Sequence, residues 1–240
     1  MTTPIVLHDF PTGRAAEGWE SFSPFVLQAA RAFKLAGLPF EQRPVNMLKL
    51  KKLNPRGQLP VVTIEGQNIP GSANIFQRVE VMKAGALTAG LDARAVAESW
   101  LWKEFADTGL YPFVLATRWA DDRGWSVVRE KFFGTVPSLM RPLIASRVRG
   151  GIVKNLGERD FLRGGLPALY ERMGRVLDDL DARAPEQGFW VGPTASVGDL
   201  ALFGHLHSLR LPLTPWQAEV VARRGRLSGY LDRVDAATRG

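Results

Sequence analysis

The chain has 240 residues, of which 45% are hydrophobic and 10% aromatic, enough for a full core in one large domain or two small ones. It contains no cysteine, which excludes disulfides, thiolate metal sites and a cysteine nucleophile, so any thiol chemistry needs a thiol from outside. The first ten residues lack a charged leader before an apolar core, and no apolar run reaches the roughly 18 residues that span a bilayer. We therefore expect a soluble, cytoplasmic protein.

The positive charge is concentrated in one stretch. Of a formal net charge of +7, residues 129–163 contribute eight basic side chains against three acidic ones. Such a band is typical of a solvated helix face or of an attraction for small anions, and recruitment to an anionic membrane surface is a third hypothesis. No nucleic-acid-binding module accompanies it, so we expect no nucleic-acid partner.

Short strands and helices alternate in the first part of the chain. A strand is predicted at 4–10, followed by a long polar loop to residue 22. Ser23 before Pro24 favours an N-cap followed by proline at the first helical position, in a helix that ends at Gly37. The next elements are expected to be a strand at 40–45, a short helix at 47–53, a strand at 61–65, a hairpin at Gly66-Gln67 into a fourth strand ending near 70, and a helix that Ser72 caps and that runs to about 84. This order predicts a four-stranded mixed sheet with helices on both sides.

Pro60 lies where proline is costly inside an ordinary strand, between Leu59 and a β-branched pair. A cis Leu59–Pro60 bond in an edge strand would turn the preceding backbone outward, toward a ligand. Alternatively, Pro60 merely begins an edge strand after a turn at 54–57. The segment alone leaves both interpretations open and makes these two residues site candidates.

Helical periodicity dominates from residue 93 onward. Ser196 and Asp199 have the spacing of a capping box, in which the serine oxygen accepts from the backbone at 199 and the aspartate reaches back. We therefore expect two domains, an α/β domain at 1–86 and an all-helical domain at 93–240.

These motifs, in this order, resemble the cytosolic glutathione transferases over the whole chain. Ser23-Pro24-Phe25 is similar to the serine-type active-site opening, and Gly57-Gln58-Leu59-Pro60 is similar to the segment that holds the glutathione backbone. The segments 118–125 and 132–142 are further similar to the failed-axon-connections and metaxin-related branch. The resemblance implies a thioredoxin-like domain followed by a helical bundle, and a homodimer.

The resemblance also implies an enzyme that adds the thiolate of glutathione, its co-substrate, to an apolar electrophile. Ser23, or Ser21 in its place, would stabilise the sulfur at the positive end of the first helix. The alternative is a non-catalytic binding or interaction protein of the same fold. Detoxification is the role expected of the enzyme, and its electrophile is not specified by the sequence.

Further residues receive roles from the same resemblance. Leu59 and Pro60 would hold the cysteinyl backbone, and Ser72 would bind the γ-glutamyl carboxylate at a helix N-terminus. The glycyl carboxylate would be held by Gln58 and Lys51, with Lys52 as the alternative to Lys51. The pocket for the electrophile would be lined by Trp102, Phe105, Tyr111 and Arg118.

The chain departs from the family pattern at Gly71, where an acid or a glutamine normally contacts the γ-glutamyl amine. Losing one hydrogen bond to a charged amine costs about 1.5 to 3 kcal/mol, so we expect weaker glutathione binding unless an acid of a neighbouring subunit compensates. The chain has three histidines and no carboxylate cluster at metal-ligand spacing, so no metal site is expected.

Overall fold

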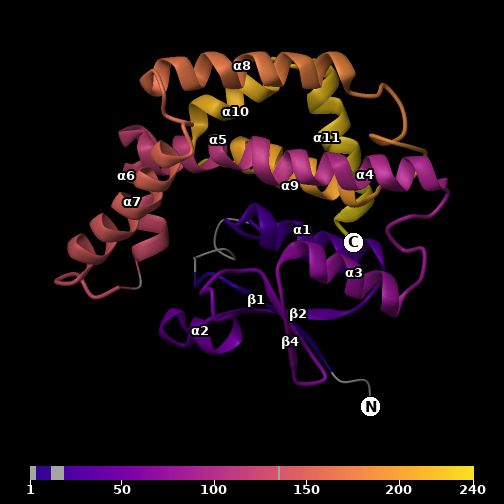
Figure 1. Ribbon diagram of the computed structural model, residues 1–240, viewed down its shortest axis with the longest axis horizontal. Coiled ribbons are helices and arrows are strands. Elements are labelled where there is room, and N and C mark those ends of the chain that lie inside the picture. Colours follow the sequence, from indigo (N-terminus) through magenta and orange to yellow (C-terminus); the bar gives the residue numbers. More distant parts are fainter. Residues whose placement is uncertain (1–3, 12–18, 135) are drawn as a thin grey trace.

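A four-stranded mixed sheet carries the first part of the chain in this computed structural model, which describes residues 4–11, 19–134 and 136–240 (Figure 1). The strand order is β2-β1-β3-β4, with β1 parallel to β2 and β3 antiparallel to both of its neighbours. The strands are β1 (Ile5–Asp9), β2 (Phe40–Pro44), β3 (Val61–Ile64) and β4 (Gln67–Pro70). β1 and β3 form the centre, and apolar side chains such as Leu7 and Val62 are buried there.

Two longer helices and a short helical segment accompany this sheet. They are α1 (Pro24–Leu35), the short pair η2 (Met47–Lys49) and α2 (Leu50–Leu53), and α3 (Ser72–Met82). α1 and α3 pack against one another and against the strands, because their apolar faces bury Val26, Phe33 and Phe76 in one core. The α/β domain is thioredoxin-like, as the sequence predicts.

The remainder of the described chain is helical, which confirms the predicted fold class. Its elements are α4 (Ala93–Phe105), the π-helical segment η3 (Ala106–Leu110), α5 (Tyr111–Leu115), the π-helical segment η4 (Ala116–Ala120), α6 (Asp122–Phe133), α7 (Arg141–Glu158), α8 (Gly165–Arg183), α9 (Val197–Arg210), α10 (Pro215–Ala222) and α11 (Gly225–Thr238). α9 is apolar on nearly all sides and lies between α4 and α1, so it forms the common core of both domains. None of the described helices is both long enough and apolar enough to cross a membrane.

Local differences from the sequence prediction concern two turns. The β3–β4 hairpin turns at Glu65 and Gly66, which have φ of 52° and 77°, one residue earlier than predicted. The N-cap of α3 is Gly71 rather than Ser72, which is the first residue inside the helix. Most of the predicted polar loop, residues 12–18, lies outside the described residues.

The predicted capping box is confirmed at the start of α9. The Asp199 carboxylate accepts from the backbone N–H and the hydroxyl of Ser196, at 2.9 and 2.6 Å. It also accepts from the Trp190 N–H at 2.8 Å and from the Tyr230 hydroxyl at 2.7 Å. The capping box therefore joins the start of α9 to α11 and to the segment before α9.

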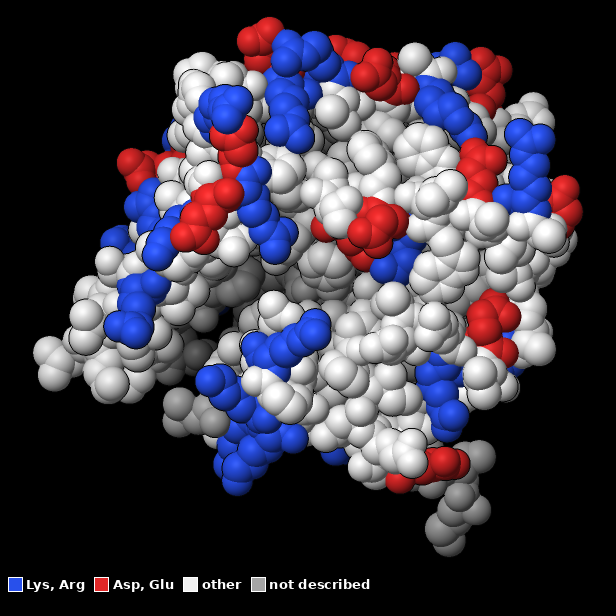
Figure 2. Space-filling model, viewed as in Figure 1, with Lys and Arg blue, Asp and Glu red and all other residues white. Residues whose placement is uncertain are grey.

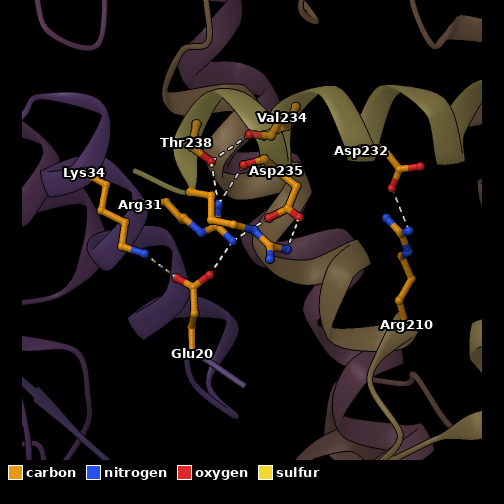
Figure 3. Close-up of polar contacts among 9 residues, drawn as sticks. Glu20, Arg31, Lys34, Arg210, Asp232, Val234, Asp235 and Thr238 are labelled. Carbon is orange, nitrogen blue, oxygen red and sulfur yellow. Dashed lines mark hydrogen bonds and ion pairs between the residues drawn. The ribbon is translucent and has the colours of Figure 1, made fainter. Parts of the chain in front are cut away.

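A buried arginine links α1 to α11 (Figure 3). The guanidinium of Arg31 is paired with Glu20 and, at 2.6 Å, with Asp235, and it donates to the hydroxyl of Thr238 at 3.1 Å. Glu20 also accepts from Lys34 at 3.2 Å. Because Glu20 precedes Ser23 by three residues, this network fixes the segment that leads into α1.

Candidate functional site

Ser23 lies at the N-terminus of α1, as predicted. Its backbone is extended, and its hydroxyl oxygen accepts from the N–H of Val26 at 3.3 Å, so it caps the helix while its own O–H remains a donor. Pro24 occupies the first helical position, where the lack of an N–H costs no hydrogen bond. The positive end of the helix dipole therefore lies beside a hydroxyl donor, an arrangement that favours an anion.

The segment before Ser23 is held by a chain of hydrogen bonds that starts on β1. Asp9, at the end of this strand, accepts from the Ser21 hydroxyl at 2.9 Å and from the Gln42 amide at 2.9 Å. The Ser21 oxygen in turn accepts from the N–H of Ser23 at 3.0 Å. Ser21, the alternative candidate for the thiol, is therefore part of the support of Ser23. Asp9 was not among the predicted site residues, although a carboxylate at the end of a predicted strand is a signal that could have found it.

A cavity of about 390 Å³ opens beside Ser23, between the two domains. Its lining is mostly apolar and includes the aromatic residues Phe10, Phe22, Trp119, Phe132 and Phe133. Among the predicted site residues, Ser23, Tyr111 and Arg118 all line it. We call this cavity the interdomain pocket; its size and lining are typical of sites for small apolar ligands.

Arg118 is a fully buried cation in the wall of the interdomain pocket. It donates to the carbonyl oxygens of Phe22 at 2.6 Å and Ser208 at 3.0 Å, and its Nε–H has no partner among the described residues. Burial lowers its pKa to about 10, an effect that the neighbouring Tyr111 opposes. Burial also raises the pKa of Tyr111, so at neutral pH this wall offers a neutral phenol and a cation.

The predicted glutathione-binding residues form a second group around the start of β3. The Leu59–Pro60 peptide bond is cis, as in the first of the two interpretations of this segment. Both interpretations were wrong in placing Pro60 at an edge strand, because β3 pairs with β1 on one side and with β4 on the other. The Pro60 carbonyl accepts from the N–H of Gly71 at 2.9 Å. Leu59 and Pro60 therefore lie next to Gly71 and Ser72, at the N-terminus of α3.

Lys51 lies beside Gly57, the residue before Gln58, at the neighbouring turn. The aliphatic stem of Lys51 passes 3.6 Å from the point where a side chain at Gly57 would begin, directly before Gln58. Asn54 is buried and shapes this turn, because its amide donates to the Gln58 carbonyl at 2.8 Å and accepts from the Arg56 N–H at 3.1 Å. Asn54 is a second supporting residue that the sequence analysis did not assign.

Two family models match the chain. One describes the glutathione S-transferase N-terminal domain and covers residues 24–124, and the other describes the glutathione S-transferase C-terminal domain and covers residues 163–233. Together they span more than two thirds of the sequence, in the order that the structure shows. The chain belongs to the glutathione S-transferase superfamily.

A β-etherase and several glutathione S-transferases of known structure share this fold over nearly the whole chain. The β-etherase LigF from Sphingobium sp. strain SYK-6 is 19% identical, with a TM-score of 0.62 and coverage of 100% of this chain and 98% of its own. A glutathione S-transferase from Sinorhizobium meliloti 1021 is 16% identical, with a TM-score of 0.63 and coverage of 99% and 91%. Glutathione S-transferase III is 21% identical, with a TM-score of 0.62 and coverage of 98% and 94%. No curated protein matches in sequence.

Two predicted pocket residues lie elsewhere. Trp102 and Phe105 border a separate open groove, with Leu101 on α4 and Leu180 on α8, and the structure does not bring them to Ser23. The π-helical segment η3 lies between Trp102 and Tyr111, so the regular spacing of an α-helix does not relate the faces on which these two residues lie.

The described part of the chain contains no group of three potential metal-ligating side chains. His205 is held in a buried polar cluster, 2.9 Å from Asp107 and 3.1 Å from Gln28, and burial lowers its pKa despite the opposing carboxylate. The cluster joins α1, α9 and the α4–η3 helix, so these contacts account for the histidine as a structural residue.

Proposed function

We propose that this protein conjugates glutathione to an apolar electrophile, with Ser23 stabilising the sulfur. One observation carries the proposal: the Ser23 hydroxyl lies at the N-terminus of α1 and also lines the apolar interdomain pocket. A thiolate placed there would have a hydroxyl donor and a helix dipole on one side and space for an apolar substrate on the other.

The remaining predicted residues would hold the tripeptide. The backbone of Leu59 would pair with the cysteinyl backbone, the N–H of Ser72 would bind the γ-glutamyl carboxylate, and Lys51 with Gln58 would bind the glycyl carboxylate. The contacts that support this arrangement are the hydrogen bond from Gly71 to Pro60 and the approach of Lys51 to Gly57. Both carboxylates of glutathione would meet positive charge or free N–H groups.

The chemistry of the thiol addition needs few groups from the protein. The thiolate attacks the electrophilic carbon, and negative charge moves onto the leaving group or an acceptor atom of the electrophile. The cation of Arg118 lies in the same pocket and would stabilise this charge in a largely dry environment. We therefore infer an aromatic or otherwise apolar electrophile that carries an acceptor group.

Turnover of a chloronitrobenzene with glutathione tests the proposal. Ser23→Ala removes one hydrogen bond to a charged group, worth about 1.5 to 3 kcal/mol, so kcat/KM should fall about 10- to 100-fold. The rising limb of the pH–rate profile should also move up by about one to two pH units, because the thiol loses the donor that lowers its pKa.

Ser228→Ala on α11, whose hydroxyl donates to the Val221 carbonyl, is the matched control and should leave both quantities unchanged. If the parent protein shows neither turnover nor heat of binding with glutathione, the proposal is wrong and a non-catalytic role takes its place. An aromatic ether belongs in the substrate panel, since one structural neighbour is a β-etherase.

A homodimer is part of the proposal. Val81 at the end of α3 is 74% exposed and Leu101 on α4 is 71% exposed, and the two helices are neighbours through Phe76 and Trp100. Leu101→Arg should convert a dimer into a monomer, measured by light scattering after size exclusion. Leu139→Arg, at an exposed leucine in the connection between α6 and α7, is the control. An unchanged mass for both variants would exclude the face formed by α3 and α4 as the dimer interface.

Four finer assignments remain predictions. The serine-type class depends on the Ser23 experiment above, and the relation to the failed-axon-connections and metaxin-related branch depends on the residue pattern at 118–142 alone. Cytoplasmic location and a role in detoxification follow from the proposed activity and are checked by fractionation and by sensitivity of a deletion strain to electrophiles.

A further inference from the structure

Two segments of the chain carry basic residues and no acidic ones. Residues 42–64 contain five lysines and arginines, residues 131–157 contain five more, and neither segment contains an aspartate or glutamate. Both border the interdomain pocket, the first through Met47 and the second through Phe132, Ile144 and Val148. The two rims of the pocket therefore share one sign of charge.

These rims lie at the same end of the molecule. Figure 1 shows α2 and the projecting arm of α6 and α7 on one side, away from α3 and α11. In Figure 2, lysine and arginine side chains gather over α2, beside a hollow that separates this helix from the arm. The loop end of the arm, by contrast, is largely free of charged side chains in this view.

The arm exposes large apolar side chains at its loop end. Leu139 is 93% exposed, Leu143 is 76% exposed and Met140 is 55% exposed. Among the described residues, five of the eight exposed large hydrophobic side chains belong to the two basic segments, including Met47 on the opposite rim. Apolar exposure is thus concentrated where the acidic residues are missing.

Several of the positive charges on these rims have no ion-pair partner among the described residues, whereas Arg43, Arg149 and Lys154 pair with Glu41, Asp122 and Glu158. Lys49, Lys51, Lys52 and Arg56 form no ion pair with any described residue, and neither does Arg147 on α7. On α8, by comparison, Arg175 pairs with Glu171 at 2.5 Å. A surface with unpaired cations around exposed leucines is complementary to anionic head groups above an acyl layer.

We propose that the mouth of the interdomain pocket docks on an anionic lipid surface. Leu139, Met140 and Leu143 insert at the boundary between head groups and acyl chains, while Arg147 and the lysines of α2 contact lipid phosphates. Docking in this orientation turns the pocket toward the bilayer, so that an apolar substrate enters from the lipid; this delivery rests on the proposed function, whereas the docking does not.

Other occupants fit the surface less well. A nucleic acid would use the basic residues but would leave Leu139 and Leu143 without an apolar partner. A second copy bound symmetrically through the same surface would bring unpaired cations of the two copies together, which is repulsive. Lipid satisfies both the charge and the apolar side chains.

Vesicle co-sedimentation without glutathione tests the docking separately from catalysis. The protein should bind vesicles of mixed phosphatidylserine and phosphatidylcholine, bind pure phosphatidylcholine much less, and lose affinity as salt is raised. Arg147→Glu should weaken binding at least about tenfold, because each basic residue near the surface contributes about fivefold. Arg175→Glu makes the same change in net charge on α8 and should weaken binding less than about twofold.

A double variant, Leu139→Ser with Leu143→Ser, tests the apolar part. It should weaken binding at least about fivefold with its melting temperature unchanged, since both side chains are exposed. Three outcomes would each overturn the proposal. They are equal losses for Arg147→Glu and Arg175→Glu, no loss for the leucine variant, and displacement of the protein from vesicles by duplex DNA at low concentration. A change of oligomeric state in the leucine variant would assign the surface to a second copy instead.

Discussion

Gly71 has no side chain, and its backbone conformation is one that other residues adopt only at a cost in free energy. Its φ is +87°, a region that L-residues rarely occupy, and this conformation lets the chain leave β4 and begin α3 at Ser72. A side chain at Gly71 would meet only the Asn74 amide, at 3.9 Å, so there is room for one. The cost of a larger residue here is therefore in the backbone, not in packing.

Gly71→Glu should restore a partner for the γ-glutamyl amine of glutathione. Gaining one hydrogen bond to a charged group is worth about 1.5 to 3 kcal/mol, so affinity should rise at least about tenfold in calorimetry. The strained backbone should lower the free energy of unfolding by about 1 to 3 kcal/mol. Gly71→Ala carries the same strain without the carboxylate and should lose stability without gaining affinity; equal affinity in both variants would remove the glutathione assignment at this position.

Helices of the two domains are joined by charge as well as by apolar packing. Arg31 on α1 is almost fully buried and is paired with Glu20 and with Asp235 on α11, whereas Arg210 on α9 pairs with Asp232 at the surface (Figure 3). Breaking a buried pair leaves an uncompensated charge, but a surface pair is screened by water.

Arg31→Met should therefore lower the free energy of unfolding by about 3 to 5 kcal/mol, because Glu20 and Asp235 lose the buried cation between them and keep only their more exposed partners, Lys34 and Arg239. Arg210→Met removes an ion pair in the same view and should cost less than about 1 kcal/mol. Chemical denaturation of both variants measures the difference. Similar losses for the two would show that Arg31 does not act through its buried pairs.

At the scale of the whole molecule, a partly buried histidine makes stability depend on pH. His207 on α9 stacks on Phe203, with ring centroids 4.7 Å apart. Burial lowers its pKa to about 4; Asp235 opposes this and Arg210 reinforces it. Because the folded-state pKa lies below the unfolded value of about 6.5, the unfolded chain takes up the proton first as pH falls.

The contribution of His207 to the free energy of unfolding should therefore be fully present above pH 6.5 and should be lost as pH falls toward 4. At pH 4.5 the loss amounts to about 2 to 3 kcal/mol. His207→Phe keeps an aromatic ring on Phe203 but cannot be protonated, so its unfolding free energy should fall less between pH 7 and pH 4.5. Parallel pH curves for the variant and the parent would contradict the assignment.

Much of the fold and part of the candidate site are local in origin. The N-cap at Ser23 and the capping box at Ser196 and Asp199 each follow from a few adjacent residues, whereas the residues around Pro60 left the cis bond as one of two interpretations, and the structure decided for it. The physical basis of both caps is the hydrogen bonding and sterics of neighbouring backbone groups, so sequence order is sufficient information. The hairpin turn lies one residue earlier than predicted. This type of turn needs positive φ at both of its central positions, and Glu65 and Gly66 adopt it.

The sequence by itself determined the order of the elements, excluded a cysteine nucleophile, and placed a hydroxyl at the start of the first helix. Only the tertiary structure decided that Tyr111 and Arg118 share a pocket with Ser23, that Trp102 faces a different groove, and that α6 and α7 build the outer wall. The reason is that a pocket is made by side chains of helices far apart in the chain, and its members depend on which faces those helices turn toward one another once the core is packed.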